Sequence, residues 1–134
     1  KWARQKRYWF YCSYLLIMNI EELREYCIRK KRVTESFPFD ERVLVFKVMN
    51  KMFALTNITT CESVNLKCDP EKALELRATF EGILEGYHMS KKHWNTVLLE
   101  SDIRTSHLLS LIDDSYNLVV SKLTTKEKEA LSLL

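Results

Sequence analysis

Glycine and proline are scarce in this chain of 134 residues, which contains two of each. Two isolated glycines cannot build a glycine-rich phosphate-binding loop, and neither a P-loop nor a GxSxG motif occurs. No apolar run approaches the roughly 18 residues that a membrane-spanning helix needs. With 46% hydrophobic and 29% charged residues, the composition indicates one compact soluble domain without a recognisable catalytic motif.

Cysteine occurs at four positions, 12, 27, 61 and 68. The spacing of Cys61 and Cys68 matches neither a zinc finger nor a CxxC redox motif. A metal site built from Cys68, His88 and His93 fits no known ligand signature, and Cys68 is expected to face the core as an inert thiol. We therefore predict a cytoplasmic protein that is not an enzyme and needs no metal or cofactor.

The formal net charge of +3 is unevenly distributed. Residues 1–17 hold four basic and no acidic side chains, which leaves 17 basic and 18 acidic residues in 18–134. The body of the chain is therefore close to neutral. Only a local patch of basic side chains could attract nucleic acid.

Residues 1–17 are basic and aromatic and differ from everything after them. They lack the long apolar stretch and the small-residue cleavage site of a secretory signal. Because Met18 opens a conventional domain start, we divide the chain into an N-terminal extension, 1–17, and a domain, 18–134. Three interpretations of the extension stay open: upstream sequence from a misplaced start, a tail packed on the domain or on a neighbouring subunit, and a membrane-surface anchor.

The pattern of apolar residues predicts the secondary structure of the domain. Strands are expected at 43–48, 52–56, 62–68, 83–89 and 93–99. Helices are expected at about 20–31, at 70–79, after residue 102 and in a short segment after residue 124. The expected caps are Asn19 with Glu22, Asp69 before Pro70, Ser101 or Asp102, and Thr124 with Glu127.

The main elements follow the order α-β-β-β-α-β-β-α. This order predicts a two-layer α+β fold, in which helices pack on a single antiparallel sheet of about five strands. One face of the sheet, if no helix covers it, would be available to a partner. On the last long helix, Asp113, Asp114 and Tyr116 are expected to hydrogen-bond back to the sheet in a structural role.

Polar and aromatic residues crowd the expected hairpin at residues 86–97, which read GYHMSKKHWNTV. At its tip, Lys91, Lys92 and His93 would be able to reach phosphates, as the wing of a DNA-binding protein does. The alternative interpretation is that the lysines only keep a turn soluble.

Further side chains would extend this surface. Trp94 or Tyr87 could stack on bases, and Lys67 and His88 would lie beside them. The alternative for Trp94 is a place in the core. Glu62 and Glu85 would interrupt the basic patch.

Seven separated segments of residues 18–134 resemble the MmcQ/YjbR-like family in their order and spacing. They are FPFD at 37–40, VFKV at 45–48, KMFAL at 51–55, NLKCDPE at 65–71, GYHM at 86–89, KHWNTV at 92–97 and LIDDSYNLV at 111–119. The resemblance implies a small bacterial cytoplasmic domain of the CyaY-like or secretion-chaperone-like kind. Family members are commonly labelled DNA-binding because of a double-wing shape. They have a Lys-x-His-Trp motif at the place of the expected hairpin, and the resemblance implies that Lys92, His93 and Trp94 carry over.

The leading hypothesis is a non-catalytic binding module that contacts phosphates of double-stranded DNA through the sheet and the basic hairpin. The rival is a protein- or small-ligand-binding module of chaperone-like architecture with no role in nucleic-acid binding. Phosphate binding weakens steeply with added salt, whereas binding in an apolar groove does not, so salt dependence separates the two.

Overall fold

The computed structural model describes residues 18–87 and 89–133. Its helices are α2 (Ile20–Ile28), α3 (Pro70–Thr79), α4 (Thr105–Ser121) and α5 (Thr125–Ser132). Its strands are β1 (Val33–Ser36), β2 (Val43–Val48), β3 (Lys51–Asn57), β4 (Ser63–Lys67), β5 (Ile83–Glu85) and β6 (Trp94–Leu98). The predicted extension at 1–17 lies outside the described residues.

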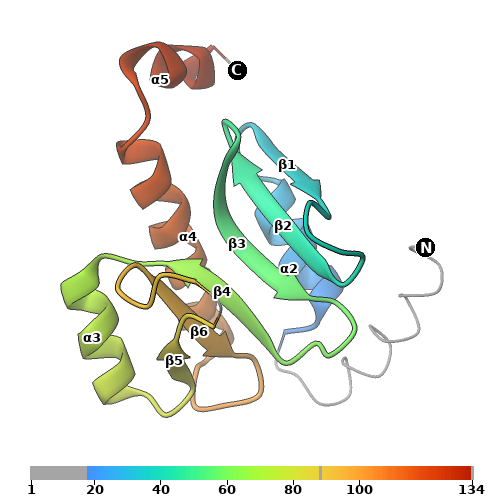
Figure 1. Cartoon of the computed structure of the whole chain (residues 1–134), viewed down its shortest axis with the longest axis vertical. Helices are drawn as coiled ribbons and strands as arrows, with labels where there is room; N and C mark the ends of the chain where they lie inside the picture. Colours follow the sequence, from blue (N-terminus) through green and yellow to red (C-terminus); the bar gives the residue numbers. More distant parts are fainter. Residues whose placement is uncertain (1–17, 88, 134) are drawn as a thin grey trace.

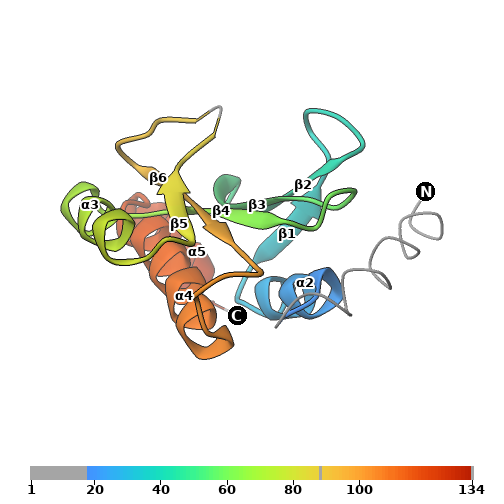
Figure 2. The same ribbon diagram turned by 90° about the horizontal axis from the view of Figure 1, so that it is seen from below.

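The six strands form one antiparallel sheet in the order β1-β2-β3-β4-β6-β5 (Figure 1). Helices α2 and α4 cover one face of it (Figure 2). The predicted two-layer α+β fold is therefore confirmed, with one strand more than expected. No helix among the described residues is long and apolar enough to cross a membrane.

The additional strand is β1, which follows the segment where the sequence predicted a helix up to residue 31. The helix ends at Ile28, and Arg32, with φ of 59°, turns the chain back along β2. β1 escaped prediction because its four residues, VTES, form a short and polar edge strand. The bidentate contact of Arg24 on α2 with Glu35 on β1 fastens this edge strand to the helix layer.

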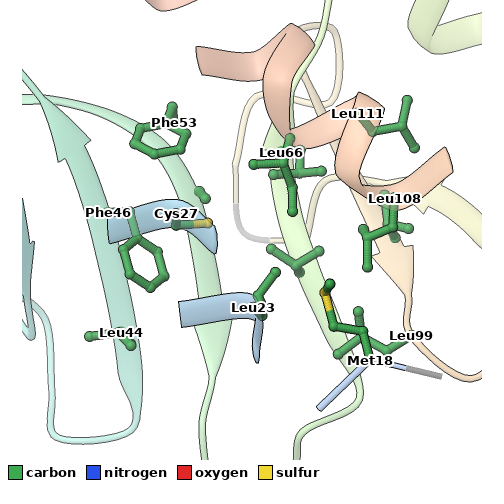
Figure 3. Packing of buried hydrophobic residues seen from close by; sticks show 14 of the residues in the cluster. Met18, Leu23, Cys27, Leu44, Phe46, Phe53, Leu66, Leu99, Leu108 and Leu111 are labelled. Atoms are coloured by element: carbon green, nitrogen blue, oxygen red, sulfur yellow. The ribbon is translucent and has the colours of Figure 1, made fainter. Parts of the chain in front are cut away.

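The main core lies between the helices and one face of the sheet, as Figure 3 shows. Leu44, Phe46 and Val48 of β2 point toward the helices because alternate residues of a strand share a face. Their partners include Leu23 on α2 and a T-shaped pair of aromatic rings from β3 and α4. A continuous apolar core of this kind fixes which face of the sheet stays open.

Ser115 joins α4 to two strands that diverge. Its hydroxyl donates to the carbonyl oxygen of Phe53 on β3 (2.6 Å) and accepts from the N–H of Lys67 on β4 (2.9 Å). The residue is completely buried, so no water replaces these bonds. One small hydroxyl therefore satisfies two backbone groups where the β3–β4 ladder has ended.

The helix caps were largely predicted. The capping boxes of Asn19 with Glu22 and of Thr124 with Glu127 are both present. The prediction that Ser101 or Asp102 caps α4 is wrong, because Arg104 occupies the N-cap position without a side-chain bond. Asp102 instead accepts from the backbone N–H groups of residues 81 and 82, in the turn before β5. Asp69 precedes α3 as expected but makes no capping hydrogen bond.

Candidate functional site

The face of the sheet opposite α2 and α4 has no helix over it among the described residues, and two loops rise from it (Figure 2). The β1–β2 loop comprises residues 37–42, and the β5–β6 loop comprises residues 86–93. The second loop is longer than predicted, because the strand expected at 83–89 ends at residue 85. The open face therefore has a wall on each of two sides.

A groove with a volume of about 660 Å³ lies on this face between the two loops. We call it the open-face groove. It is lined by apolar side chains of both loops and two strands together with hydroxyl and amide groups: Phe39, Val43, Met52, Leu55, Thr56, Asn57, Thr60, Glu62, Ser63, Asn65, Tyr87, Met89, Ser90 and Thr96. Glu62 is the only charged residue among the described residues that line it.

A small apolar cluster forms the base of the open face. Val45, Leu55 and Trp94 are buried there, with Met52 and Met89 packed against them. Trp94 is 7% exposed. This burial agrees with the alternative interpretation, in which Trp94 belongs to a core, and its ring is not offered for stacking.

Two other aromatic rings take the exposed positions. Phe39 on the β1–β2 loop is 65% exposed, and Tyr87 on the β5–β6 loop is 72% exposed. Large exposed aromatic side chains on both walls of a groove are typical of a binding surface. The sequence analysis named Tyr87 but missed Phe39. The available signal was an apolar residue between Pro38 and Asp40, in a segment unable to continue a strand or helix.

Polar contacts hold the amides of the groove in fixed orientations. Asn65 Oδ1 accepts from the Thr96 hydroxyl at 2.6 Å. Asn57 Oδ1 accepts from the N–H and the hydroxyl of Thr59, at 2.9 and 2.7 Å. With both oxygens engaged, each amide can present its NH₂ group to a ligand.

Arg77 of α3 holds the β5–β6 loop in place. Its Nε donates to Asn95 Oδ1 (2.7 Å), and its terminal nitrogen donates to the carbonyl oxygens of Trp94 (3.2 Å) and Lys91. Gly86, at the start of the loop, passes so close to Trp94 that a Cβ atom would lie 2.7 Å from Trp94 Cβ. The shape of the β5–β6 loop therefore depends on Arg77, which lies on another element, and on the lack of a side chain at Gly86.

None of the predicted basic residues that the structure describes lines the groove. They lie in the β5–β6 loop or beside it on β4, and we call this border of the groove its rim. Lys91 and Lys92 are exposed on the β5–β6 loop, and Lys91 forms an ion pair with Glu85 (3.4 Å). His93 is half-buried and its carbonyl oxygen accepts from the N–H of Cys68 (2.8 Å). Lys67, half-buried, is directly opposite Trp94 in the β4–β6 ladder and so shares its face. His88 lies outside the described residues.

The polar residues of α4 act elsewhere. Asp113 accepts from Tyr26 (2.7 Å) and Lys30 (2.5 Å) of α2, and Tyr116 donates to the carbonyl oxygen of Lys31. Asp114 accepts from Lys72 of α3 (2.9 Å). The expectation that the three residues bond back to the sheet is therefore wrong, because their side chains bond to α2, to the segment that follows it and to α3. The hydrogen bond to Asp113, together with burial, raises the pKa of Tyr26 to about 12. Burial raises the pKa of Asp113, but the bonds from Lys30 and Tyr26 outweigh it and lower the value overall.

Burial raises the pKa of the Cys68 thiol, which keeps it protonated and weakly nucleophilic. Within the described part of the chain, no three His, Cys, Asp or Glu residues are grouped as metal ligands would be.

The comparisons with known proteins agree with this architecture. The YjbR family model matches residues 28–118. The chain belongs to the YjbR family. It is 31% identical to the uncharacterized protein YjbR of Escherichia coli K12 over 85% of this chain and 98% of that protein. It is 38% identical to the uncharacterized protein YbdF of Escherichia coli O157:H7 over 69% of this chain and 77% of that protein.

A solved relative shares the fold. The crystal structure of Deinococcus radiodurans protein DR2400, with a domain of family DUF419, superposes with a TM-score of 0.79 at 41% identity. The match covers 84% of this chain and 87% of that chain. The resemblance to the YjbR family is thus confirmed by the family model and the sequence relatives, and the fold is shared with a solved structure.

Proposed function

We propose that this member of the YjbR family is a non-catalytic binding module that takes DNA on the open face of its sheet. The proposal rests on one observation above all. Two loops rise on the same open face, and one of them carries exposed Lys91 and Lys92. Exposed lysines on a projecting loop can follow a phosphate backbone while the sheet lies against the nucleic acid.

Local charge, rather than net charge, supports this proposal. Residues 18–134 hold 17 basic and 18 acidic side chains, so attraction of DNA to this domain requires a local group of lysines, which the proposal places at the rim of the groove. Lys67 adds a third positive charge to the open face, whereas Glu85 partly neutralises Lys91. We therefore expect few phosphate contacts and modest affinity at physiological salt.

The test is fluorescence anisotropy of labelled DNA with the full chain at low and moderate salt. We expect Lys91→Glu/Lys92→Glu to weaken binding and to reduce the slope of log K against log salt by about one for each lost phosphate contact. Lys122→Glu/Lys126→Glu is the matched control, because it changes charge equally on the α4–α5 side. Replacing Lys1, Arg4, Lys6 and Arg7 with Gln removes the charge of residues 1–17 from the measurement. Equal weakening by both lysine pairs, or no binding at low salt, contradicts the proposal.

A second candidate is a module for a neutral small ligand or a peptide, which would occupy the open-face groove itself. The observation in its favour is that no lysine or arginine is among the described residues that line the groove. Ligand sites are typically concave and mostly apolar with a few placed polar groups. Binding of such a ligand would change little with salt, whereas phosphate binding must weaken.

A further inference from the structure

The chemistry of the open-face groove differs from that of its rim. The rim carries Lys91 and Lys92, but the groove presents aromatic, methionine and amide groups with one acid, Glu62. Phosphates suit the rim and are disfavoured inside. A ligand that contacts both the groove and its rim must carry an uncharged, flat, partly polar group next to a phosphate.

The two aromatic walls suit a stacked ring. Phe39 and Tyr87 line the same groove from different loops and are both largely exposed. In duplex DNA the faces of the bases are stacked inside the helix and cannot meet a protein aromatic ring. Bases of a single strand are free to do so, and every base has a ring face that stacks on an aromatic side chain.

The floor suits the edge of a base. With their oxygens engaged, Asn57 and Asn65 offer NH₂ donors. Nucleobases carry carbonyl and ring-nitrogen acceptors along their edges, which such donors match. The volume of about 660 Å³ falls within the roughly 300–1,000 Å³ typical of small-molecule sites, and so has room for a base.

We propose that the open-face groove takes unpaired bases of single-stranded nucleic acid, stacked against Phe39 and Tyr87, while Lys91 and Lys92 contact the adjoining phosphates. This inference rests on the proposed DNA-binding function and specifies the form of the nucleic acid. It differs from the duplex expected from the sequence. In this arrangement a base occupies the groove, and the nucleic-acid strand continues along the β5–β6 loop.

The experiment compares three labelled probes at one salt concentration: a short oligothymidylate strand, its duplex with oligoadenylate, and an abasic strand of equal length. The full chain is expected to bind the thymidylate strand about tenfold more tightly than the duplex or the abasic strand. Phe39→Ala/Tyr87→Ala is expected to lose about tenfold to a hundredfold for the thymidylate strand alone. Leu74→Ala, which removes an exposed apolar side chain on α3, is the matched control and is expected to bind as the unaltered chain does.

Each outcome has a separate meaning. If Phe39→Trp keeps the tight binding that Phe39→Ala/Tyr87→Ala loses, a stacking role is supported, because tryptophan retains an aromatic face. Duplex binding that depends on Lys91 and Lys92 but not on Phe39 and Tyr87 overturns this inference and leaves the proposed function standing. Competition by thymidine monophosphate as effective as that by the strand overturns the inference in favour of a small-ligand site. No binding of any probe at low salt overturns both.

Discussion

Replacing Arg77 with alanine removes the side chain that ties α3 to the β5–β6 loop. Its bond to Asn95 Oδ1 involves an ionised donor and an acceptor that is 2% exposed. A hydrogen bond of this kind contributes about 1.5–3 kcal/mol to stability. Its removal leaves the buried Asn95 oxygen without another donor. The exposed carbonyl of Lys91 can bind water instead, and the carbonyl of Trp94 keeps the N–H of Gly86. We therefore expect Arg77→Ala to lower the free energy of unfolding by about 2–3 kcal/mol.

Urea unfolding of the full chain measures this change. Arg104→Ala is the matched control, because Arg104 is exposed at the N-cap of α4 and makes no side-chain capping bond there. Arg77→Lys is also expected to be destabilising, since an ammonium group cannot reproduce the planar fork that reaches three acceptors. Hydrogen exchange should show faster opening at Gly86 and Trp94 than at α4. A loss of less than about 0.5 kcal/mol, within the range of ordinary surface substitutions, would refute this reasoning.

Three further predictions concern Gly86 beside the open face, Ser115 between α4 and the sheet, and the contact of Tyr26 on α2 with Asp113 on α4. Gly86→Ala places a Cβ atom 2.9 Å from the Trp94 carbonyl oxygen, so thermal or urea unfolding should show a loss of about 1–3 kcal/mol. Ser115→Ala leaves two buried strand backbone groups without their partner and should cost about 2–4 kcal/mol, whereas Ser110→Ala on the same helix should cost little. Because the pKa of Tyr26 is raised from 10.0 to about 12, stability should fall as pH rises between these values, and Asp113→Asn should lower the phenol pKa measured by ultraviolet titration.

Each of the three has a result that would count against it. Unchanged stability in Gly86→Ala would mean that the loop relaxes away from Trp94. A cost for Ser115→Ala no larger than that of Ser110→Ala would mean that the hydroxyl does not join the diverging strands. An unchanged Tyr26 phenol pKa in Asp113→Asn would remove the hydrogen bond as the main cause of the shift.

Much of the fold could be predicted because local signals agreed with one another. Each of these elements was specified directly by a local signal: the β-branched and aromatic residues of β2, the alternating residues of β4, Pro70 at the start of α3 and the two capping boxes. β1 could not be predicted in this way, because its four mostly polar residues show neither the helical nor the strand periodicity of apolar residues. The early end of β5 could not be predicted either. β5 ends where Gly86 passes close to Trp94, and no local sequence pattern indicates that close approach.

The candidate site was predicted only in part. The exposure of Lys91 and Lys92 could be predicted from their place in a polar connection. The burial of Trp94 could not, because it depends on packing against β2 and β3. Phe39 and Tyr87 are 48 positions apart, and no local pattern shows that they line one groove. The supporting role of Arg77 likewise depends on how α3 packs beside β6.

Mapping of backbone amide shifts tests the central claim most directly. The full chain, labelled with nitrogen-15, is titrated with a short oligothymidylate strand and its two-dimensional amide spectrum is recorded. We predict shifts at Phe39, Asn57, Asn65 and Tyr87, which line the open-face groove, and in the segment 91–92 of the β5–β6 loop. Shifts confined to α4 and α5, or no shifts at a strand concentration that saturates the anisotropy signal, would contradict the account.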